Sequence, residues 1–403
     1  MVTENNNEGA LRGVRVADFT QLVQGPWATQ MLGDMGADII KIEPPGGDWM
    51  RHYAYGNLYP AGQSISFLGF NRNKRSIALD LKSTEGLQAA RDIISKCDIL
   101  IENFRPGVMD RLGIGYESLQ AVQPGLIYCA SSGYGKDGPY QTRPGQDLLA
   151  QSLAGGAWLN GRRGDLPVVT AVGQADLLTS LFIVQSVLAA LYHRQQTGRG
   201  QRIDASLLNS IIAFHTQEIT AYLYKGANPE RSAAGIPNPW LGAPYGLYPT
   251  RDSYIAIGMN SVRRLAAIMG IEGYDRKEFD SNNIIGERDA IYENFAAVFR
   301  TKTTEEWLSR LLPHDIWCSQ VNTFREMAVD PQVLHNKMII EYDHPAAGKV
   351  ATTGIPVQFS RTPAAVRRPA PLLGEHTEEI LTGICGYTPE QVQAVHGSVR
   401  TPS

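Results

Sequence analysis

The acid at position 176 stands directly before the longest apolar stretch of the chain. Gly173-Gln174-Ala175-Asp176 leads into residues 177–192, which carry almost no charge. A carboxylate at a helix start can accept hydrogen bonds from the free N–H groups of the first turn, and the helix dipole favours its ionised form. An ionised, partly desolvated carboxylate is also what covalent catalysis by a carboxylate requires. The local pattern is therefore consistent both with an ordinary N-cap and with a nucleophile.

A second carboxylate lies on a turn earlier in the chain, in the segment Pro144-Gly145-Gln146-Asp147. Two carboxylates on neighbouring loops can act as an acid/base pair when their surroundings separate their pKa values. Aspartate in a loop is also a common Asx-turn residue, because its side chain bonds to the nearby main chain. Asp147 is therefore either a partner of Asp176 in the chemistry or a turn residue.

Basic residues gather at two places where they could bind phosphates. The segment 71–82 contains Arg72, Lys74, Arg75 and Lys82. Such a cluster is either a phosphate site or a solvated charged turn. Asn103-Phe104-Arg105 directly follows a predicted strand, and Arg111 lies a turn further on. Because α/β sheets bind ligands beyond the carboxyl ends of their strands, we expect Arg105 and Arg111 to contact a ligand.

Composition argues against several classes of protein. The chain has 403 residues, enough for two or more domains, and a net charge of -3, which gives no basic excess for nucleic acid or an anionic membrane. The four cysteines form no CxxC pair and the eight histidines no HxxxH or HExxH spacing, so no metal site is predicted. We expect buried, reduced thiols and a cytoplasmic location. Residues 177–192 fall short of the roughly 20 needed to span a bilayer, so no membrane association is expected.

Strands and helices alternate along the first third of the chain. Alternating or continuous apolar runs predict strands, and helical spacing predicts helices between them. The predicted strands are 14–19, 38–43, 98–102 and 126–130, and the predicted helices are 26–35, 83–96 and 116–122. This order favours a doubly wound, mostly parallel, Rossmann-like α/β domain. The dinucleotide fingerprint GxGxxG is absent after the first strand.

The remaining chain indicates a smaller α/β domain. Helices are predicted at about 176–196 and 206–224, followed by a Pro- and Asn-rich loop at 226–245. A strand at 254–257 and helices over 261–312 come next. We therefore expect a large domain beginning with 11–225, linkers and a small domain at 226–330, and a segment at 331–403 that returns to the large domain.

Taken together, these segments resemble the class III CoA-transferases, a family that includes formyl-CoA transferase, carnitine CoA-transferase and α-methylacyl-CoA racemase. The resemblance covers roughly residues 11–397. Its markers, in order, are Asp18-Phe19-Thr20 with Gly25-Pro26, Gly36-Ala37-Asp38-Ile39-Ile40-Lys41-Ile42-Glu43, Asn73-Lys74-Arg75-Ser76, Glu102-Asn103-Phe104-Arg105-Pro106-Gly107, Gly198-Arg199-Gly200-Gln201 with Asp204, and Pro371-Leu372-Leu373-Gly374-Glu375-His376-Thr377.

The resemblance implies a mechanism and a partner. The family's catalytic aspartate matches Asp176, which would attack an acyl-CoA to give an aspartyl anhydride and then an aspartyl-CoA thioester. An acceptor carboxylate then displaces CoA by the reverse steps. CoA is thus a substrate, with no prosthetic group. The family's members are intertwined homodimers, and we expect the same here.

The resemblance also bears on individual site residues. The family's CoA contacts match Leu79, Lys82, Asn103, Phe104, Arg105 and Arg111. The substrate loop matches residues 21–24, with Gln21 and Val23 where formyl-CoA transferase has His and Gln, so specificity for oxalate or formate is not implied. Tyr53 lies on a loop with Trp49, Arg51 and His52 that we expect near the acyl group, where Arg51 would suit a dicarboxylate or would simply face solvent.

Two other functions remain open. The family's racemases have a His-Asp pair where this chain has Gln146-Asp147. Because a glutamine neither takes nor gives a proton at neutral pH, racemisation is disfavoured and Gln146 is expected to bond the substrate, with Asp147 beside it. An acyl-CoA racemase or epimerase is therefore the alternative enzyme. A catalytically silent CoA-binding protein is the third possibility, which the acid at 176 argues against.

Overall fold

A computed structural model of the chain describes residues 9–399. The chain divides into two compact units. The large unit contains residues 9–150, 173–214 and 331–399, and the second unit contains 151–172 and 215–330. Residues 151–172 and 215–225, which we had expected in the large domain, therefore belong to the second unit.

A six-stranded parallel sheet forms the centre of the large unit, in the order β3-β2-β1-β4-β5-β6. Its strands are β1 (Arg15–Asp18), β2 (Asp38–Glu43), β3 (Lys74–Ala78), β4 (Ile99–Glu102), β5 (Ile127–Ser132) and β6 (Arg202–Ser206). The chain builds outward from β1 to β3 and then crosses back to β4. In an open α/β sheet, this reversal between β1 and β4 opens a crevice beyond the carboxyl ends of the strands.

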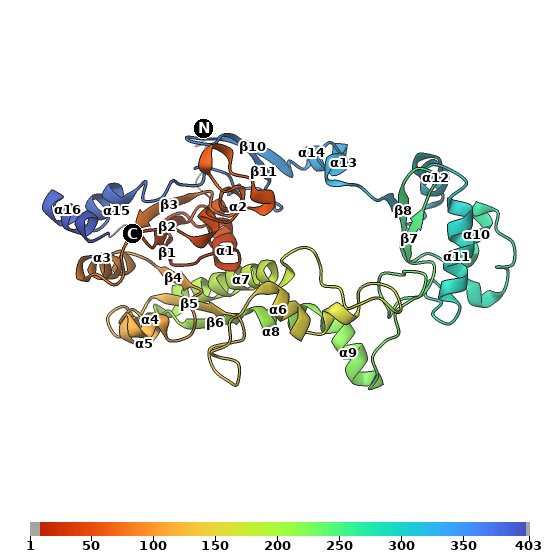
Figure 1. Ribbon diagram of the computed structural model, residues 1–403, viewed down its shortest axis with the longest axis horizontal. Coiled ribbons are helices and arrows are strands. Elements are labelled where there is room, and N and C mark those ends of the chain that lie inside the picture. The colour runs from red at the N-terminus through yellow and green to blue at the C-terminus, as the bar shows by residue number, and fades with distance from the viewer. Residues whose placement is uncertain (1–8, 400–403) are drawn as a thin grey trace. The chain divides into compact units, whose positions relative to one another are not determined.

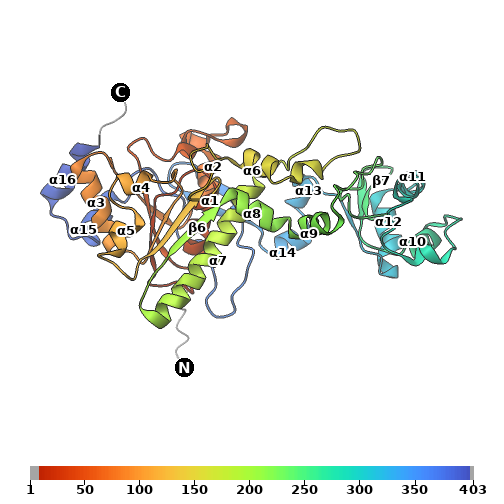
Figure 2. The same cartoon turned by 90° about the horizontal axis from the view of Figure 1, so that it is seen from below.

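Helices cover both faces of this sheet, as Figures 1 and 2 show. One face packs against α3 (Thr84–Ser95), α4 (Val108–Arg111), α5 (Tyr116–Gln120), α15 (Thr377–Gly383) and α16 (Pro389–Ser398). The other face packs against α1 (Gln24–Asp34) and α7 (Gln174–Thr197). Alternate residues supply the two cores: Ala17 and Ile40 face the first, and Val16 and Ile39 the second. The prediction of a doubly wound, mostly parallel α/β fold is confirmed for this unit.

Four of the six strands were predicted, and the two outer ones, β3 and β6, were not. Both carry charged residues where a buried strand is expected to be apolar. The expected helix at 206–224 is instead the end of β6, then α8 (Leu207–Phe214) and α9 (Thr216–Lys225). The thiols of Cys97 and Cys129 are free and buried as expected, whereas Cys318 and Cys385, also free, are only half-buried.

β3 can be buried because its lysine is paired. Lys74 and Asp18 are fully buried, and Lys74 Nζ lies 3.1 Å from Asp18 Oδ2. On β2, the buried Lys41 Nζ lies 2.8 Å from Asp48 Oδ2. Removing one partner of such a pair would leave an uncompensated buried charge, which costs about 3–5 kcal/mol. These pairs therefore join β3 to the end of β1, and β2 to the loop that follows it.

The second unit has its own sheet and core. β7 (Gly246–Pro249), β8 (Tyr254–Ile257) and β9 (Cys318–Gln320) form an antiparallel sheet. The helices α10 (Val262–Met269), α11 (Arg288–Phe299) and α12 (Thr304–Leu311) contribute to the core with Tyr248, Phe295, Phe299 and Trp307 among its buried aromatics. Of these strands only β8 was predicted, while the helices over 261–312 are confirmed.

Shorter elements complete the two units. α2 (Ile65–Phe70), α14 (Pro331–His335) and the antiparallel hairpin of β10 (Ile339–His344) and β11 (Gly348–Thr353) belong to the large unit, and α13 (Phe324–Met327) to the second. α6 (Asp147–Leu153) begins in the large unit and ends in the second. Among the residues described, α7 alone is long and apolar enough, by length and composition, to cross a membrane.

Candidate active site

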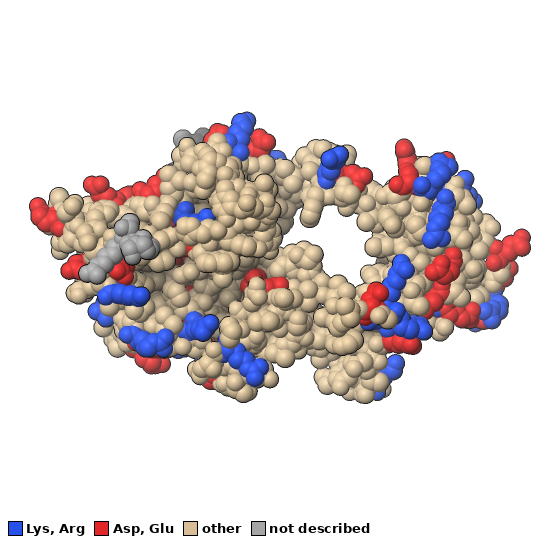
Figure 3. All heavy atoms as spheres, in the orientation of Figure 1, with Lys and Arg blue, Asp and Glu red and all other residues tan. Residues whose placement is uncertain are grey.

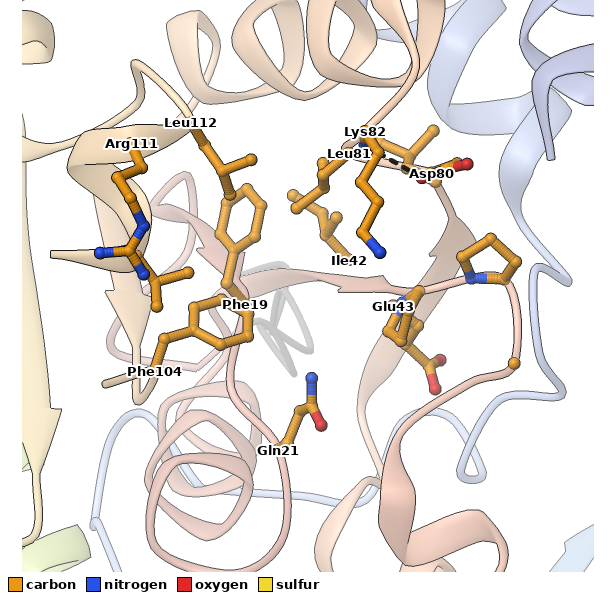
Figure 4. A pocket seen from close by; sticks show the side chains of 15 residues that line it. Phe19, Gln21, Ile42, Glu43, Asp80, Leu81, Lys82, Phe104, Arg111 and Leu112 are labelled. Carbon is orange, nitrogen blue, oxygen red and sulfur yellow. Dashed lines mark hydrogen bonds between the residues drawn. The ribbon is translucent and has the colours of Figure 1, made fainter. Parts of the chain in front are cut away.

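A cleft of about 570 Å³ lies where the sheet reverses, beyond the carboxyl ends of β1, β2, β3 and β4. Figure 4 shows its side chains. They are Phe19 and Gln21 after β1, Ile42, Glu43, Pro44, Pro45 and Gly46 at β2, Leu79, Asp80, Leu81 and Lys82 after β3, and Phe104, Val108, Arg111 and Leu112 after β4. A cleft of this size accommodates a ligand of several hundred daltons.

The cleft has apolar walls and two cations. Phe19, Phe104 and Leu112 give it flat, apolar surface, while Arg111 and Lys82 extend from opposite sides (Figure 4). Both cations are exposed and belong to the lining, as the sequence predicted. Apolar walls between separated cations suit a ligand with an aromatic base and several phosphates.

Other predicted cations are engaged elsewhere. Arg72 bonds both carboxylate oxygens of Asp34, at 2.9 and 2.7 Å, and Lys74 pairs with Asp18. Arg75 pairs with Asp38 at 2.6 Å. The proposed phosphate cluster at 71–82 is therefore wrong for these three residues, since internal carboxylates neutralise them. Arg105 is exposed on the turn after β4 and does not line the cleft.

Two loops of the cleft are joined across the point of reversal. Asn103 Nδ2 donates to Gln21 O at 2.8 Å, and Gln21 N donates to Asn103 Oδ1 at 2.9 Å. Asn103 therefore acts on the cleft by holding the loop that carries Gln21. Leu79 is fully buried in the core and contributes to the wall from β3.

The same loop connects the cleft to Asp176. Gln24, at the first position of α1, accepts a hydrogen bond at its main-chain oxygen from Ser180 Oγ, at 2.6 Å. Ser180 Oγ also contacts the main-chain oxygen of Asp176, at 3.0 Å. Residues 21–24 thus run from the cleft to the first turns of α7.

Asp176 is the third residue of α7 and not its N-cap. Gly173 occupies the N-cap position and offers no side chain to the free N–H groups. The N-cap interpretation of Asp176 is therefore wrong. The half-buried side chain of Asp176 does not serve as the N-cap of α7, so it is available to react with a substrate.

Asp147 supplies the missing cap from another element. Its Oδ1 accepts hydrogen bonds from the main-chain N–H groups of Ala175, at 2.7 Å, and Asp176, at 3.3 Å. The two carboxylates whose proximity the sequence left open are thus brought together. Asp147 is the first residue of α6, so the helix holds its main chain in place.

Burial, and after it the charge of Asp147, raises the pKa of Asp176 to about 7. We had expected the helix dipole to keep the Asp176 carboxylate ionised. This expectation is wrong, because the effect of desolvation on its pKa outweighs that of the dipole. The folded state binds this proton more tightly than the unfolded chain, so stability decreases as the pH rises between 3.8 and about 7. A carboxylate of this basicity is a better nucleophile than an ordinary aspartate.

Aromatic side chains adjoin the two carboxylates. Burial is the main cause that raises the pKa of Tyr55, and the nearby Tyr53, Asp176 and Asp147 raise it further. Tyr53 meets Tyr55 edge to face at 6.1 Å and stacks on Trp49 at 4.9 Å. The predicted residue Tyr53 therefore belongs to an aromatic cluster with Trp49 and Tyr55, of which Tyr55 is influenced by the charges of the two carboxylates. Tyr55 was missed, because an aromatic residue in a loop carries no local signal of its neighbours.

Three residues that we expect near the acyl group have the following surroundings. Arg51 bonds both carboxylate oxygens of Glu43 at 2.7 Å and lies 3.7 Å from the ring centroid of Phe67, so its guanidinium group does not face solvent. Val23 is the N-cap of α1 and packs against a small apolar cluster. Gln146 is exposed, and its main-chain oxygen accepts from two N–H groups of α6.

Comparison with known proteins identifies the family. A model of CoA-transferase family III matches residues 11–377. The chain belongs to this family, and the enzyme class predicted from the sequence is confirmed.

Relatives and solved structures agree. The chain is 34% identical over 383 residues to succinyl-CoA:glutarate CoA-transferase of Mus musculus, covering 94% of this chain and 87% of the relative. It is 35% identical over 428 residues to formyl-CoA:oxalate CoA-transferase of Bradyrhizobium sp. (strain ORS 278), covering 96% of each. A CaiB/BaiF family protein from Brucella suis has a TM-score of 0.82 and 30% identity, covering 94% of this chain and 100% of that one.

We predict that Asp147→Asn lowers the pH at which activity is half-maximal. In the wild type, activity that needs ionised Asp176 should fall about tenfold from pH 8 to pH 6, following a pKa of about 7. The asparagine keeps an oxygen for the N–H groups of α7 but removes the charge, so the midpoint should shift downward. The measurement is the pH profile of CoA exchange.

Comparison of Asp147→Ala with Asp147→Asn separates the effect of the charge from that of the cap, because alanine removes both. It should shift the pH profile in the same direction and also lower the free energy of unfolding by about 1 kcal/mol, because the cap is lost. Identical pH profiles in the wild type and both variants would contradict the role given to the Asp147 charge.

Proposed function

We propose that the protein transfers CoA from an acyl-CoA to a free carboxylic acid through covalent intermediates on Asp176. The observation that carries the proposal is the half-buried Asp176 carboxylate at the start of α7, linked by residues 21–24 to a cleft of suitable size and charge for CoA. The family, which the chain belongs to, supports the same reaction.

The steps balance as follows. A carboxylate oxygen of Asp176 attacks the thioester carbonyl, which forms a mixed anhydride and expels the CoA thiolate. The thiolate then attacks the aspartyl carbonyl, which forms an aspartyl-CoA thioester and releases the donor acid. The acceptor carboxylate attacks this thioester, which forms a new anhydride and expels the thiolate. The thiolate finally attacks the acyl carbonyl of this anhydride, which forms the new acyl-CoA and releases the Asp176 carboxylate. The thioester energy is conserved, because each bond broken is replaced by one of similar reactivity.

The surroundings of Asp176 suit this chemistry. Desolvation makes the carboxylate more basic and keeps water from the anhydride, which water would hydrolyse. The cap from Asp147 fixes the main chain of Ala175 and Asp176, so the nucleophile needs little reorganisation before attack.

Replacing Asp176 by Ala should reduce CoA transfer by on the order of 10³-fold or more, because the nucleophile is lost. Binding of CoA itself should remain, since Asp176 does not line the cleft. The assay is exchange between acetyl-, succinyl- or formyl-CoA and a panel of mono- and dicarboxylic acids. Asp343→Ala, which removes an exposed carboxylate on β10, is the control. Near-normal exchange by Asp176→Ala would contradict the proposal.

The acid panel includes dicarboxylates because the relatives' names include glutarate and oxalate. Arg51 is committed to Glu43, so recognition of a second carboxylate would have to use another cation. We expect Arg51→Lys to leave the order of preferred acids unchanged.

The placement of CoA is tested at Arg111. Arg111→Ala should raise the KM for acyl-CoA about tenfold while leaving kcat and the KM for the acid nearly unchanged, since a charge-assisted bond to a phosphate is lost. Arg91→Ala, which removes an exposed arginine on α3, is the matched control. An effect confined to the KM for the acid would show that CoA lies elsewhere.

We also infer that two copies of the chain associate through the face of the large unit that includes α7. Figure 3 shows few charged side chains over α6, which borders this face. Exposed apolar residues there are Leu148, Leu149, Leu181, Phe182, Leu188, Tyr192, Ile212 and Phe214. Exposed apolar patches mark association surfaces in soluble proteins, and a second copy agrees with the homodimer implied by the family resemblance.

Phe182→Glu should convert a dimer into a monomer, because it places a charge in the apolar interface. Light scattering after size-exclusion chromatography measures the mass. Val122→Glu, at an 80% exposed apolar residue after α5, should stay dimeric. A monomeric wild type would contradict this association.

A further inference from the structure

A buried carboxylate lies directly behind the cleft, at a residue to which the proposed reaction gives no role. Glu102 is the last residue of β4 and only 7% exposed. It precedes Asn103, which holds the Gln21 loop, and Phe104, which lines the cleft. A buried carboxylate without a full countercharge is costly, so its partners indicate what it does for the fold.

The main bond of Glu102 is to the wall of the cleft. Glu102 Oε2 accepts a hydrogen bond from the main-chain N–H of Phe104 at 2.8 Å, and Tyr128 Oη donates to Oε1 at 3.3 Å. The short bond fixes the chain where it turns out of the sheet. It therefore sets the position from which the Phe104 ring enters the cleft.

We propose that Glu102 is a positioning residue for CoA, whose ionised carboxylate holds Phe104 at the wall of the cleft. This inference rests on the proposed binding of CoA there. A hydrogen bond to an ionised acceptor is about twice as strong as one to a neutral acceptor. Protonation of Glu102 should therefore loosen Phe104 and weaken CoA binding.

The pKa of Glu102 lies in the pH range in which binding can be measured. Burial raises its pKa to about 7, opposed by the bonds from Phe104 and Tyr128 and by Arg202, and assisted by Asp110. The other titratable and charged groups that face this position are Cys129, on β5, and Lys136 and Asp204, around the small cavity behind Phe104. CoA binding should thus tighten as the pH rises through 7.

The test compares CoA binding by the wild type and Glu102→Gln between pH 6 and pH 8, by calorimetry. Glutamine keeps an oxygen for the Phe104 N–H but does not titrate, and titration of CoA itself cancels in the comparison. Between pH 8 and pH 6, the dissociation constant of the wild type should rise about 3- to 10-fold relative to that of the variant. Asp110→Asn, which removes a nearby charge without a bond to Phe104, should keep a pH dependence whose midpoint is shifted to lower pH, because Asp110 helps to raise the pKa of Glu102.

A constant ratio of wild-type to Glu102→Gln affinity over this range would overturn the inference, as would binding that tightens at low pH. Absence of CoA binding by the wild type would instead overturn the proposed function, and this inference with it. Hydrogen exchange of the peptide that contains Phe104 gives a second measurement on the wild type alone. Its protection, corrected for the intrinsic rate, should increase from pH 6 to pH 8, and unchanged protection would also overturn the inference.

Discussion

The site depends on charges that are buried beneath its loops. Lys41 donates to Asp48 and to the main-chain oxygen of Thr20, while Asp48 accepts from the main-chain N–H of Leu22. Leu22 has a φ of 68°, a left-handed conformation that is unusual for leucine and persists only where its surroundings impose it. One buried ion pair thus holds the loop between the cleft and α7. Because this pair is desolvated, the loop has one defined arrangement.

Desolvation also decides the chemistry of Asp176. A fully hydrated aspartate would be a weak nucleophile, and a deeply buried one would stay protonated. Asp176 lies inside the first turn of α7 and is half-buried, which raises its pKa to about 7. At neutral pH a substantial fraction of such a carboxylate is ionised, and it is also more basic than an ordinary aspartate. Because Asp147 caps α7, the side chain of Asp176 is not needed to cap the helix. The cap and the proposed nucleophile are therefore separate residues.

The sequence predicts the parts of this protein whose signals are local. Apolar periodicity located β1, β2, β4 and β5, the basic segment 71–82 indicated Lys82, and the turn after β4 indicated Arg111. The missed features depend on partners remote in the chain. β3 is buried because Lys74 pairs with Asp18, 56 residues away, and the cap of α7 comes from Asp147, 28 residues before Ala175. Family resemblance supplied the catalytic role of Asp176, which the local pattern alone left open beside an ordinary cap.

The central claim is that an oxygen of Asp176 forms and breaks bonds to the acyl groups. A turnover with an acceptor acid labelled with ¹⁸O in both carboxylate oxygens tests it directly. The acceptor oxygen that attacks the aspartyl thioester stays on Asp176 when CoA leaves with the new acyl group. Mass spectrometry of the digested protein should then find one ¹⁸O in the peptide containing Asp176. Complete turnover with no label in that peptide, or with the label on another residue, would contradict the account.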